Sequence, residues 1–113
     1  MPMKFGYARE QRLSRKEDID LAYKTGKRVM RGRLRFFFRP NDLPVSRLGI
    51  SVPNKVGGAI ERNRWKRLIR EAFRLHPEIG PGMDILVVPL RPPEKTKRPE
   101  VEKLLLESVG AIR

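Results

Sequence analysis

Residues Lys55–Arg74 read KVGGAIERNRWKRLIREAFR, a glycine-containing loop followed by a predicted helix over Ala59–Arg74. Gly58 is an acceptable N-cap for this helix, because glycine tolerates the extended backbone that precedes a first turn. Pro77 blocks continuation of the helix and disfavours helical geometry at His76. A helix of this length spans roughly 24 Å at about 1.5 Å per residue, which is enough to follow several consecutive phosphates.

The predicted helix has an apolar side and a basic side at about 100° per residue. The apolar side carries Trp65, Leu68, Ile69, Ala72 and Phe73, and the basic side carries Asn63, Lys66, Arg67, Arg70 and Arg74. Most charge runs are solvated faces, but such faces usually mix Glu with Lys, and here only Glu71 interrupts the basic side. Because the planar guanidinium fork of arginine fits phosphate, the pattern predicts a helix that binds nucleic acid.

Composition favours the same kind of partner. The chain has 113 residues, typical of a single domain over 1–113, and its 26 lysines and arginines against 13 acidic residues give a net charge of +13. This charge raises self-repulsion and favours a polyanion. No apolar run approaches the roughly 20 residues of a membrane span, and no signal-peptide pattern opens the chain, so we expect a cytoplasmic protein without a membrane partner. The absence of cysteine excludes disulfides and thiolate metal sites.

The N-terminal region predicts an arm followed by a helix. Residues Met1–Arg12 show no hydrophobic period, which indicates an extended or mobile segment. The Ser14 hydroxyl and the Glu17 carboxylate have the spacing of a capping box, in which each accepts a bond from the other residue's backbone N–H. The predicted helix covers Arg15–Thr25 and is stopped by Gly26 at the position after the C-cap.

Alternating and apolar segments predict four strands and a final helix. The strands are expected at Arg28–Arg31, Leu34–Arg39, Arg47–Val52 and Asp84–Pro89, and the helix at Glu100–Val109 with Pro99 in its first turn. The loop Asn41–Ser46 predicts a hairpin between the second and third strands. The fourth strand is apolar on both faces, as in the interior of a sheet. Because a helix connects the third and fourth strands, we expect these two to run parallel, within an α+β fold.

One face of the predicted sheet suggests a groove for single-stranded RNA. In the second strand Arg35, Phe37 and Arg39 alternate with core residues, and an aromatic ring between two guanidinium groups suits base stacking with phosphate neutralisation. The alternative is that Phe37 packs under a terminal segment. Gly49 and Ser51 share this face if the strands form a hairpin, and their small side chains leave room above the sheet.

Tyr23 admits two interpretations. It shares one side of the first helix with Ile19 and Ala22, whereas Leu21 points elsewhere. It is either a core aromatic with its hydroxyl at the edge, or a ring available for stacking on a base.

The sequence carries no recognisable catalytic constellation. The sole histidine, His76, stands at a helix end, where contact with the helix dipole or the backbone is expected. The aspartates are scattered, at Asp18, Asp20, Asp42 and Asp84, without metal-ligand spacing. We therefore do not expect these side chains to catalyse RNA cleavage themselves.

The run AIERNRWKRLIRE, residues 59–71, resembles the signature of the bacterial ribonuclease P protein subunit, in which Arg-Asn-Arg precedes Lys-Arg and a further Arg. The resemblance extends from about Arg9 to the last helix. It implies an αβββαβα fold with a four-stranded mixed sheet and a left-handed crossover, although such crossovers are generally right-handed. Two positions depart from the family pattern: Ile19 stands where many members have an aromatic residue, and Trp65 replaces an aliphatic one, which we interpret as extra core volume.

The resemblance also implies a function and its site residues. It implies a ribonucleoprotein whose RNA uses Mg²⁺ to cleave the 5′ leader from precursor tRNA, so the expected partners are the catalytic RNA subunit and precursor tRNA, with no obligate protein partner. No protein side chain is expected to hold the metal or to act in catalysis. By position, the family's basic motif corresponds to Arg62, Asn63, Arg64, Lys66, Arg67 and Arg70. Positions lining or flanking the leader groove correspond to Ile19, Tyr23, Phe37 and Lys55, to which the strand pattern adds Arg35, Arg39 and Ser51.

Two other functions compete with this one. A structural ribosomal or RNA-chaperone protein would have the same composition, and related folds occur among ribosomal proteins and translation factors. A protein that cuts RNA unaided would need the acid, base or metal ligands that the sequence lacks. An aromatic groove beside the basic helix distinguishes the first hypothesis, because a structural protein has little use for a vacant single-strand site.

Overall fold

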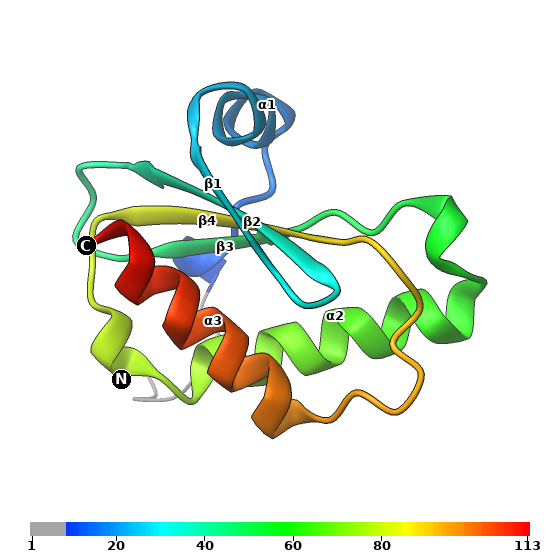
Figure 1. Cartoon of the computed structure of the whole chain (residues 1–113). Helices are drawn as coiled ribbons and strands as arrows, with labels where there is room; N and C mark the ends of the chain where they lie inside the picture. The colour runs from blue at the N-terminus through cyan, green and yellow to red at the C-terminus, as the bar shows by residue number, and fades with distance from the viewer. Residues whose placement is uncertain (1–8) are drawn as a thin grey trace.

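The computed structural model describes residues 9–113, which form one four-stranded sheet between two layers of helix (Figure 1). The strands are β1 (Lys27–Arg31), β2 (Leu34–Pro40), β3 (Arg47–Ile50) and β4 (Met83–Pro89), and the helices are α1 (Lys16–Thr25), α2 (Ala59–Arg74) and α3 (Arg98–Ile112). The predicted bounds of the basic helix and the α+β class are confirmed. Strand β3 ends two residues earlier than predicted, and α3 is longer at both ends. None of these helices is long and apolar enough to cross a membrane.

The strand order is β1-β2-β4-β3, which corrects the predicted hairpin between the second and third strands. Strand β4 lies between them, antiparallel to β2 and parallel to β3. The parallel pairing and the interior position predicted for β4 are both confirmed. The physical reason is that a strand that is apolar on both faces needs cover from helices above and below and a neighbour on each side.

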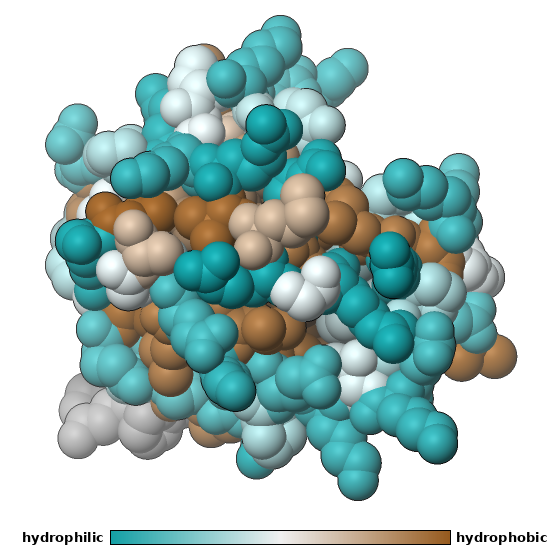
Figure 2. Space-filling model, in the orientation of Figure 1, coloured by the Kyte–Doolittle hydropathy of each residue, from teal (hydrophilic) through white to brown (hydrophobic). Residues whose placement is uncertain are grey.

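Helices α2 and α3 cover one face of the sheet and form the main core (Figure 1). Phe36 and Val87 from the sheet meet Ile69 of α2 and Leu105 of α3 in this layer, and all four are at most 2% exposed. Trp65 is 1% exposed, which confirms its predicted role in the core, and its indole N–H donates a 2.8 Å hydrogen bond to a loop carbonyl. In Figure 2 a hydrophobic band crosses the middle of the molecule and hydrophilic side chains border it.

Helix α1 covers the opposite face of the sheet over a second, smaller core. Its members are Leu13, Ala22, Phe37, Leu86 and Val88, with Ile19 packed at the edge. Leu13 reaches this core because its backbone N–H pairs with the Leu48 carbonyl at 2.9 Å. An added Cβ at Gly49 would lie 2.8 Å from the Leu13 carbonyl oxygen. Gly49 was predicted to leave room above the sheet, but the segment around Leu13 covers it.

The N-terminal predictions need two corrections. The predicted arm Met1–Arg12 lies partly outside the described residues, but Arg9–Gln11 forms a 3-10 turn and is not extended. The capping box is wrong, because the N-cap is Arg15 and no side-chain cap bond forms, so Ser14 plays no such part.

Gly26 is the C-cap of α1, one position earlier than predicted, and its φ is an ordinary −70°. The reason for glycine there is a close approach of backbone. An added Cβ would stand 2.3 Å from the Ala22 carbonyl oxygen and 3.2 Å from that of Phe38. Helix α1 therefore turns into β1 without room for a side chain.

His76 leaves helical geometry as predicted, with φ −126° and ψ 68°. Its expected dipole or backbone contact is wrong, because the ring nitrogens meet Glu78 and Glu102, each at 2.7 Å. Burial lowers the pKa of His76, but the hydrogen bonds to both carboxylates outweigh burial, so the pKa lies above its ordinary value. The same contacts lower the pKa of each glutamate. The group ties the end of α2 to α3.

Phe37 belongs to the second core, which makes its interpretation as an open stacking platform wrong. The ring is 2% exposed, and the Tyr23 ring covers it at a centroid distance of 4.8 Å with an interplanar angle of 31°. The alternative of packing under another segment describes its position better. The covering segment is α1, because β2 and β4 present apolar side chains to both faces and each face needs a helix.

We predict that Phe37→Ala destabilises the fold by about 3–5 kcal/mol, because it leaves a cavity beneath α1. Thermal unfolding of the free protein measures this effect. The control is Leu21→Ala on the exposed side of the same helix, where Leu21 is 41% exposed and a change within about 0.5 kcal/mol is expected. Equal shifts for both variants would show that the Phe37 ring does not support α1.

Candidate RNA-binding surfaces

The outward side of α2 is a basic surface, as its sequence predicts. The apolar side is buried against the sheet and α3, with Trp65, Ile69, Ala72 and Phe73 all at most 6% exposed. Asn63, Arg67 and Arg70 are exposed on the opposite side. Arg74, in the last turn, pairs with Glu71, whose carboxylate its guanidinium contacts at 2.6 Å.

Three cations of α2 make no hydrogen bond or ion pair with any residue that the structure describes: Lys66, Arg67 and Arg70. A cationic side chain without an internal partner can bind an external anion fully, because no carboxylate of the protein competes for it. This side of α2 therefore presents a row of available cations on a rigid helix.

Arg62 and Arg64 are used differently from the other basic residues of the motif. The Arg62 guanidinium donates to the Asn54 side chain at 2.8 Å, and that of Arg64 donates to the Thr96 carbonyl at 2.9 Å. The Nε atom of Arg62 is buried without a hydrogen-bond partner. These arginines bind the segments before and after α2. Sequence reasoning missed this role, because Asn54 lies in the turn before α2 and Thr96 is 32 residues away in the sequence.

A hollow of about 450 Å³ runs along the outer edge of β3. It is lined by Arg12, Leu13, Ser14, Ile19, Leu48, Gly49, Ile50, Lys66 and Arg70. The hollow brings Ile19, predicted for a leader groove, together with Lys66 and Arg70, predicted for a separate RNA surface. The two predicted surfaces are thus continuous around the edge of the sheet.

The other predicted groove residues come from four segments: Tyr23 from α1, Arg35 from β2, Ser51 from the segment after β3 and Lys55 from the 3-10 turn Asn54–Val56. Tyr23 is 54% exposed although one side of its ring rests on Phe37, and both Ser51 and Lys55 are exposed. Arg35 is partly buried and lies opposite Val88 in the register of β2 and β4. Tyr23, Ser51 and Lys55 therefore remain accessible, and Arg35 is accessible in part.

Arg39 lies away from this group. In the register of β2 and β4, Arg39 lies opposite Asp84 and Arg35 lies opposite Val88. The two arginines are therefore roughly 13 Å apart along the strand, at about 3.3 Å per residue. Arg35, Phe37 and Arg39 keep the alternation that the strand pattern predicts, but the Phe37 ring between them is buried and not open for stacking.

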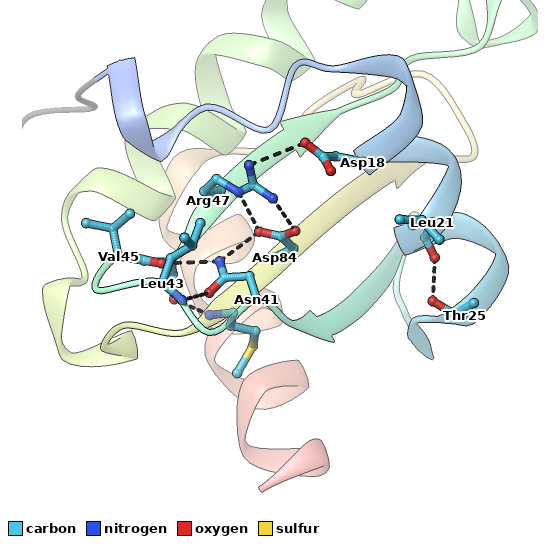
Figure 3. A network of polar contacts seen from close by, with 10 residues as sticks. Asp18, Leu21, Thr25, Asn41, Leu43, Val45, Arg47 and Asp84 are labelled. Carbon is cyan, nitrogen blue, oxygen red and sulfur yellow. Dashed lines mark hydrogen bonds and ion pairs between the residues drawn. The ribbon is translucent and has the colours of Figure 1, made fainter.

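A buried ion pair fixes α1 and β3 beside this face (Figure 3). The Arg47 guanidinium makes two bonds to Asp84, at 2.8 and 2.7 Å, and one to Asp18 of α1 at 3.4 Å. Asp84 is fully buried and also accepts a 2.8 Å bond from Asn41. Hydrogen bonding to Asp84 is the main cause that raises the pKa of Arg47, so its charge is permanent.

Sequence reasoning treated Asp18 and Asp84 as unrelated, and the structure brings both to one arginine. The signal that could have indicated the pair is the register of two parallel strands that begin with opposite charges, Arg47 opposite Asp84. Among residues 9–113 no group of three or more His, Asp or Glu side chains is placed to hold a metal ion. The accessible groups on this surface include the Lys66 and Arg70 cations, the Ser51 hydroxyl and the exposed Tyr23 ring.

Comparison with known proteins gives the family. The ribonuclease P family model matches residues 7–112. The ribonuclease P protein component of Oleidesulfovibrio alaskensis is 45% identical over 87 residues, which cover 74% of this chain and 70% of the relative. That of Thermotoga maritima is 42% identical over 84 residues, covering 74% and 72%.

Solved structures share the fold. The RNase P protein from Thermotoga maritima aligns with a TM-score of 0.80 and 34% identity, covering 90% of this chain and 97% of the other. The RNase P protein of Staphylococcus aureus aligns with a TM-score of 0.76 and 32% identity, covering 90% and 94%. The basic helix, the mixed sheet and these matches along nearly the whole chain agree, and the chain belongs to the ribonuclease P protein family.

Proposed function

We propose that this chain is the RNA-binding protein subunit of ribonuclease P, which assists a catalytic RNA in removing the 5′ leader from precursor tRNA. The observation that carries the proposal is the set of available cations Lys66, Arg67 and Arg70 on α2, continuous with the hollow that reaches Ile19. A surface of this kind suits two RNA segments at once, one along the helix and one over the sheet.

The outward side of α2 is the proposed contact with the RNA subunit. Lys66, Arg67 and Arg70 bind phosphates there, and exposed Asn63 offers both a donor and an acceptor. Arg62 and Arg64 act chiefly by holding the neighbouring loops, because their guanidinium groups already bond to Asn54 and Thr96.

The accessible part of the α1 face is the proposed leader groove. Ile19 and Tyr23 form its wall, and Arg35, Ser51 and Lys55 supply polar groups from the sheet and the loop that follows. The Tyr23 ring stacks on a leader base, since aromatic rings accept any base by stacking. Phe37 contributes by supporting Tyr23 from below.

Hydrolysis itself is assigned to the RNA subunit. That RNA would hold the Mg²⁺ that activates the attacking water, while the side chains of this protein bind and orient the strands. The substrate and the RNA partner place the proposed complex in the cytoplasm.

Reconstitution with a bacterial ribonuclease P RNA tests the function directly. We expect the protein to increase precursor tRNA cleavage at low Mg²⁺, because its cations take over part of the charge neutralisation that Mg²⁺ provides. Cleavage is measured with the RNA alone and with added protein. Binding of RNA without any increase in cleavage would instead favour a structural RNA-binding role, and cleavage without the RNA subunit would contradict the assignment of catalysis.

We predict that Tyr23→Ala weakens binding of leader-bearing precursor by about 1–3 kcal/mol, the range for removal of one base–aromatic stack. Mature tRNA lacks the leader and should bind with unchanged affinity. Both affinities are measured on the reconstituted holoenzyme, with Leu21→Ala as the control on the far side of α1. Equal weakening for precursor and mature tRNA would contradict a role of Tyr23 in the leader groove.

We predict that Arg67→Ala lowers affinity for the RNA subunit and reduces the salt dependence of binding by about 0.7 to 0.9 log units for each phosphate that the variant no longer neutralises. Affinity is measured over a series of salt concentrations. Lys103→Ala on α3 removes the same charge from an exposed site outside both proposed surfaces. If the slope falls equally for both variants, Arg67 acts only through net charge.

A further inference from the structure

The β4–α3 linker, residues 90–97, is a fixed loop that passes the N-terminal half of α2 (Figure 1). The Trp65 indole N–H donates to the Arg91 carbonyl at 2.8 Å, and the Arg64 guanidinium donates to the Thr96 carbonyl at 2.9 Å. Thr96 is 5% exposed. Both ends of the linker are therefore bound to the helix that carries the basic surface.

The middle of the linker is a tight turn that the end of β1 and the start of β2 hold from the other side. The Thr96 N–H donates to the Pro93 carbonyl at 2.8 Å. Arg33 donates to the Pro92 carbonyl at 2.8 Å and contacts the Glu94 carboxylate at 3.0 Å. Glu94 has a φ of 46°, a left-handed conformation that costs free energy in a residue other than glycine. The loop therefore has a defined shape, and its one carboxylate is already paired.

Lys95 and Lys97 remain without an internal partner. Both side chains are exposed, and neither makes a hydrogen bond or ion pair with any residue that the structure describes. Lys97 is the N-cap of α3, where no side-chain cap bond forms and where a positive charge opposes the helix dipole. A serine, threonine, asparagine or aspartate would stabilise this position better. The stability of α3 therefore does not explain this lysine, whereas a bound anion would.

The two lysines extend the cations of α2 to its second flank. Lys66 follows Arg64 by two residues, about 200° around the helix axis, so their side chains point to opposite flanks. Lys66 and Arg70 border the hollow along β3, whereas Arg64 holds the linker with Lys95. A helix with its side chains is about 10–12 Å wide, so cations on its two flanks suit two separate backbone segments of a nucleic acid.

We propose that Lys95 and Lys97 bind phosphates of the catalytic RNA subunit, on the opposite side of α2 from Lys66 and Arg70. This inference rests on the proposed function, because α2 is taken to contact that RNA. The bond from Arg64 to the linker keeps the two lysines beside the helix. Helix α2 then lies between two backbone segments of the RNA subunit instead of along one.

The test is the salt dependence of binding to a bacterial ribonuclease P RNA, measured for the full-length wild type and for Lys95→Ala/Lys97→Ala. Each lost phosphate contact lowers the slope of log affinity against log salt by about 0.7 to 0.9, so we expect a decrease of about 1.4 to 1.8. The matched control is Lys27→Ala/Lys103→Ala, which removes two exposed lysines, one at the start of β1 and one on α3. An equal decrease for both double variants would overturn the proposal, because net charge alone would then account for it.

Thermal unfolding of the free protein gives an independent readout. The variant Lys95→Ala/Lys97→Ala should unfold at the wild-type temperature or above it, because it removes a positive charge from the N-terminus of α3. A clear decrease in that temperature would count against the proposal, since the lysines would then serve the fold.

The absence of cysteine from the chain permits a positional test. Lys95→Cys, labelled with an iron chelate that generates hydroxyl radicals, should cut a backbone segment of the bound RNA subunit. The same label at Lys103→Cys should cut none, and equal patterns from both positions would contradict a contact at the linker.

The salt series also separates the two proposals. If Arg67→Ala lowers the slope and Lys95→Ala/Lys97→Ala does not, the linker contact is overturned and the contact through α2 stands. If neither variant changes the slope more than the control does, the proposed contact of α2 with the RNA subunit falls as well.

Discussion

The buried ion pair between Arg47 and Asp84 is the interaction on which the arrangement of this protein depends. Asp84 is fully buried at the start of the central strand, and a buried carboxylate without its partner would cost several kcal/mol. Its partner is the first residue of β3, so satisfying this charge places β3 beside β4 in parallel register. The same guanidinium reaches Asp18 and thereby sets α1 over the sheet. Both proposed RNA surfaces border β3 or α1, so their geometry follows from one satisfied charge.

Much of the fold could be predicted from the sequence because its signals are local. The helix over Ala59–Arg74 is bounded by a glycine and by the residues before a proline, and its apolar period is strong, so both ends match the structure. The interior position of β4 follows from an apolar run on both faces, and its parallel partner follows from the helical connection. The outward side of α2 follows from the same periodicity. In each case a few neighbouring residues carry the information.

The features that the sequence could not supply depend on pairing between distant segments. A turn-like loop at Asn41–Ser46 suggests a hairpin, but whether β4 inserts between β2 and β3 depends on which arrangement buries more apolar surface. The alternation in β2 correctly predicts that Phe37 lies on the second face of the sheet. Whether this face is covered at Phe37 depends on where α1 packs, which the alternation does not reveal. The division of the motif into arginines that fasten loops and cations that stay available has the same origin. Arg64 meets Thr96, a residue of another segment that no spacing rule connects to it.

The charge balance gives the protein a thermodynamic reason to bind RNA. Arg33, Arg47, Arg74 and Arg98 are paired with carboxylates, while most other lysines and arginines of the described residues are not, in a chain of net charge +13. Their mutual repulsion opposes the compact state, because folding brings them closer together. A polyanion that binds the folded surface removes this penalty and stabilises the fold by mass action. The unpaired cations that lower the stability of the free protein therefore stabilise its complex with RNA. In the free protein the two apolar cores must supply the stability of the fold.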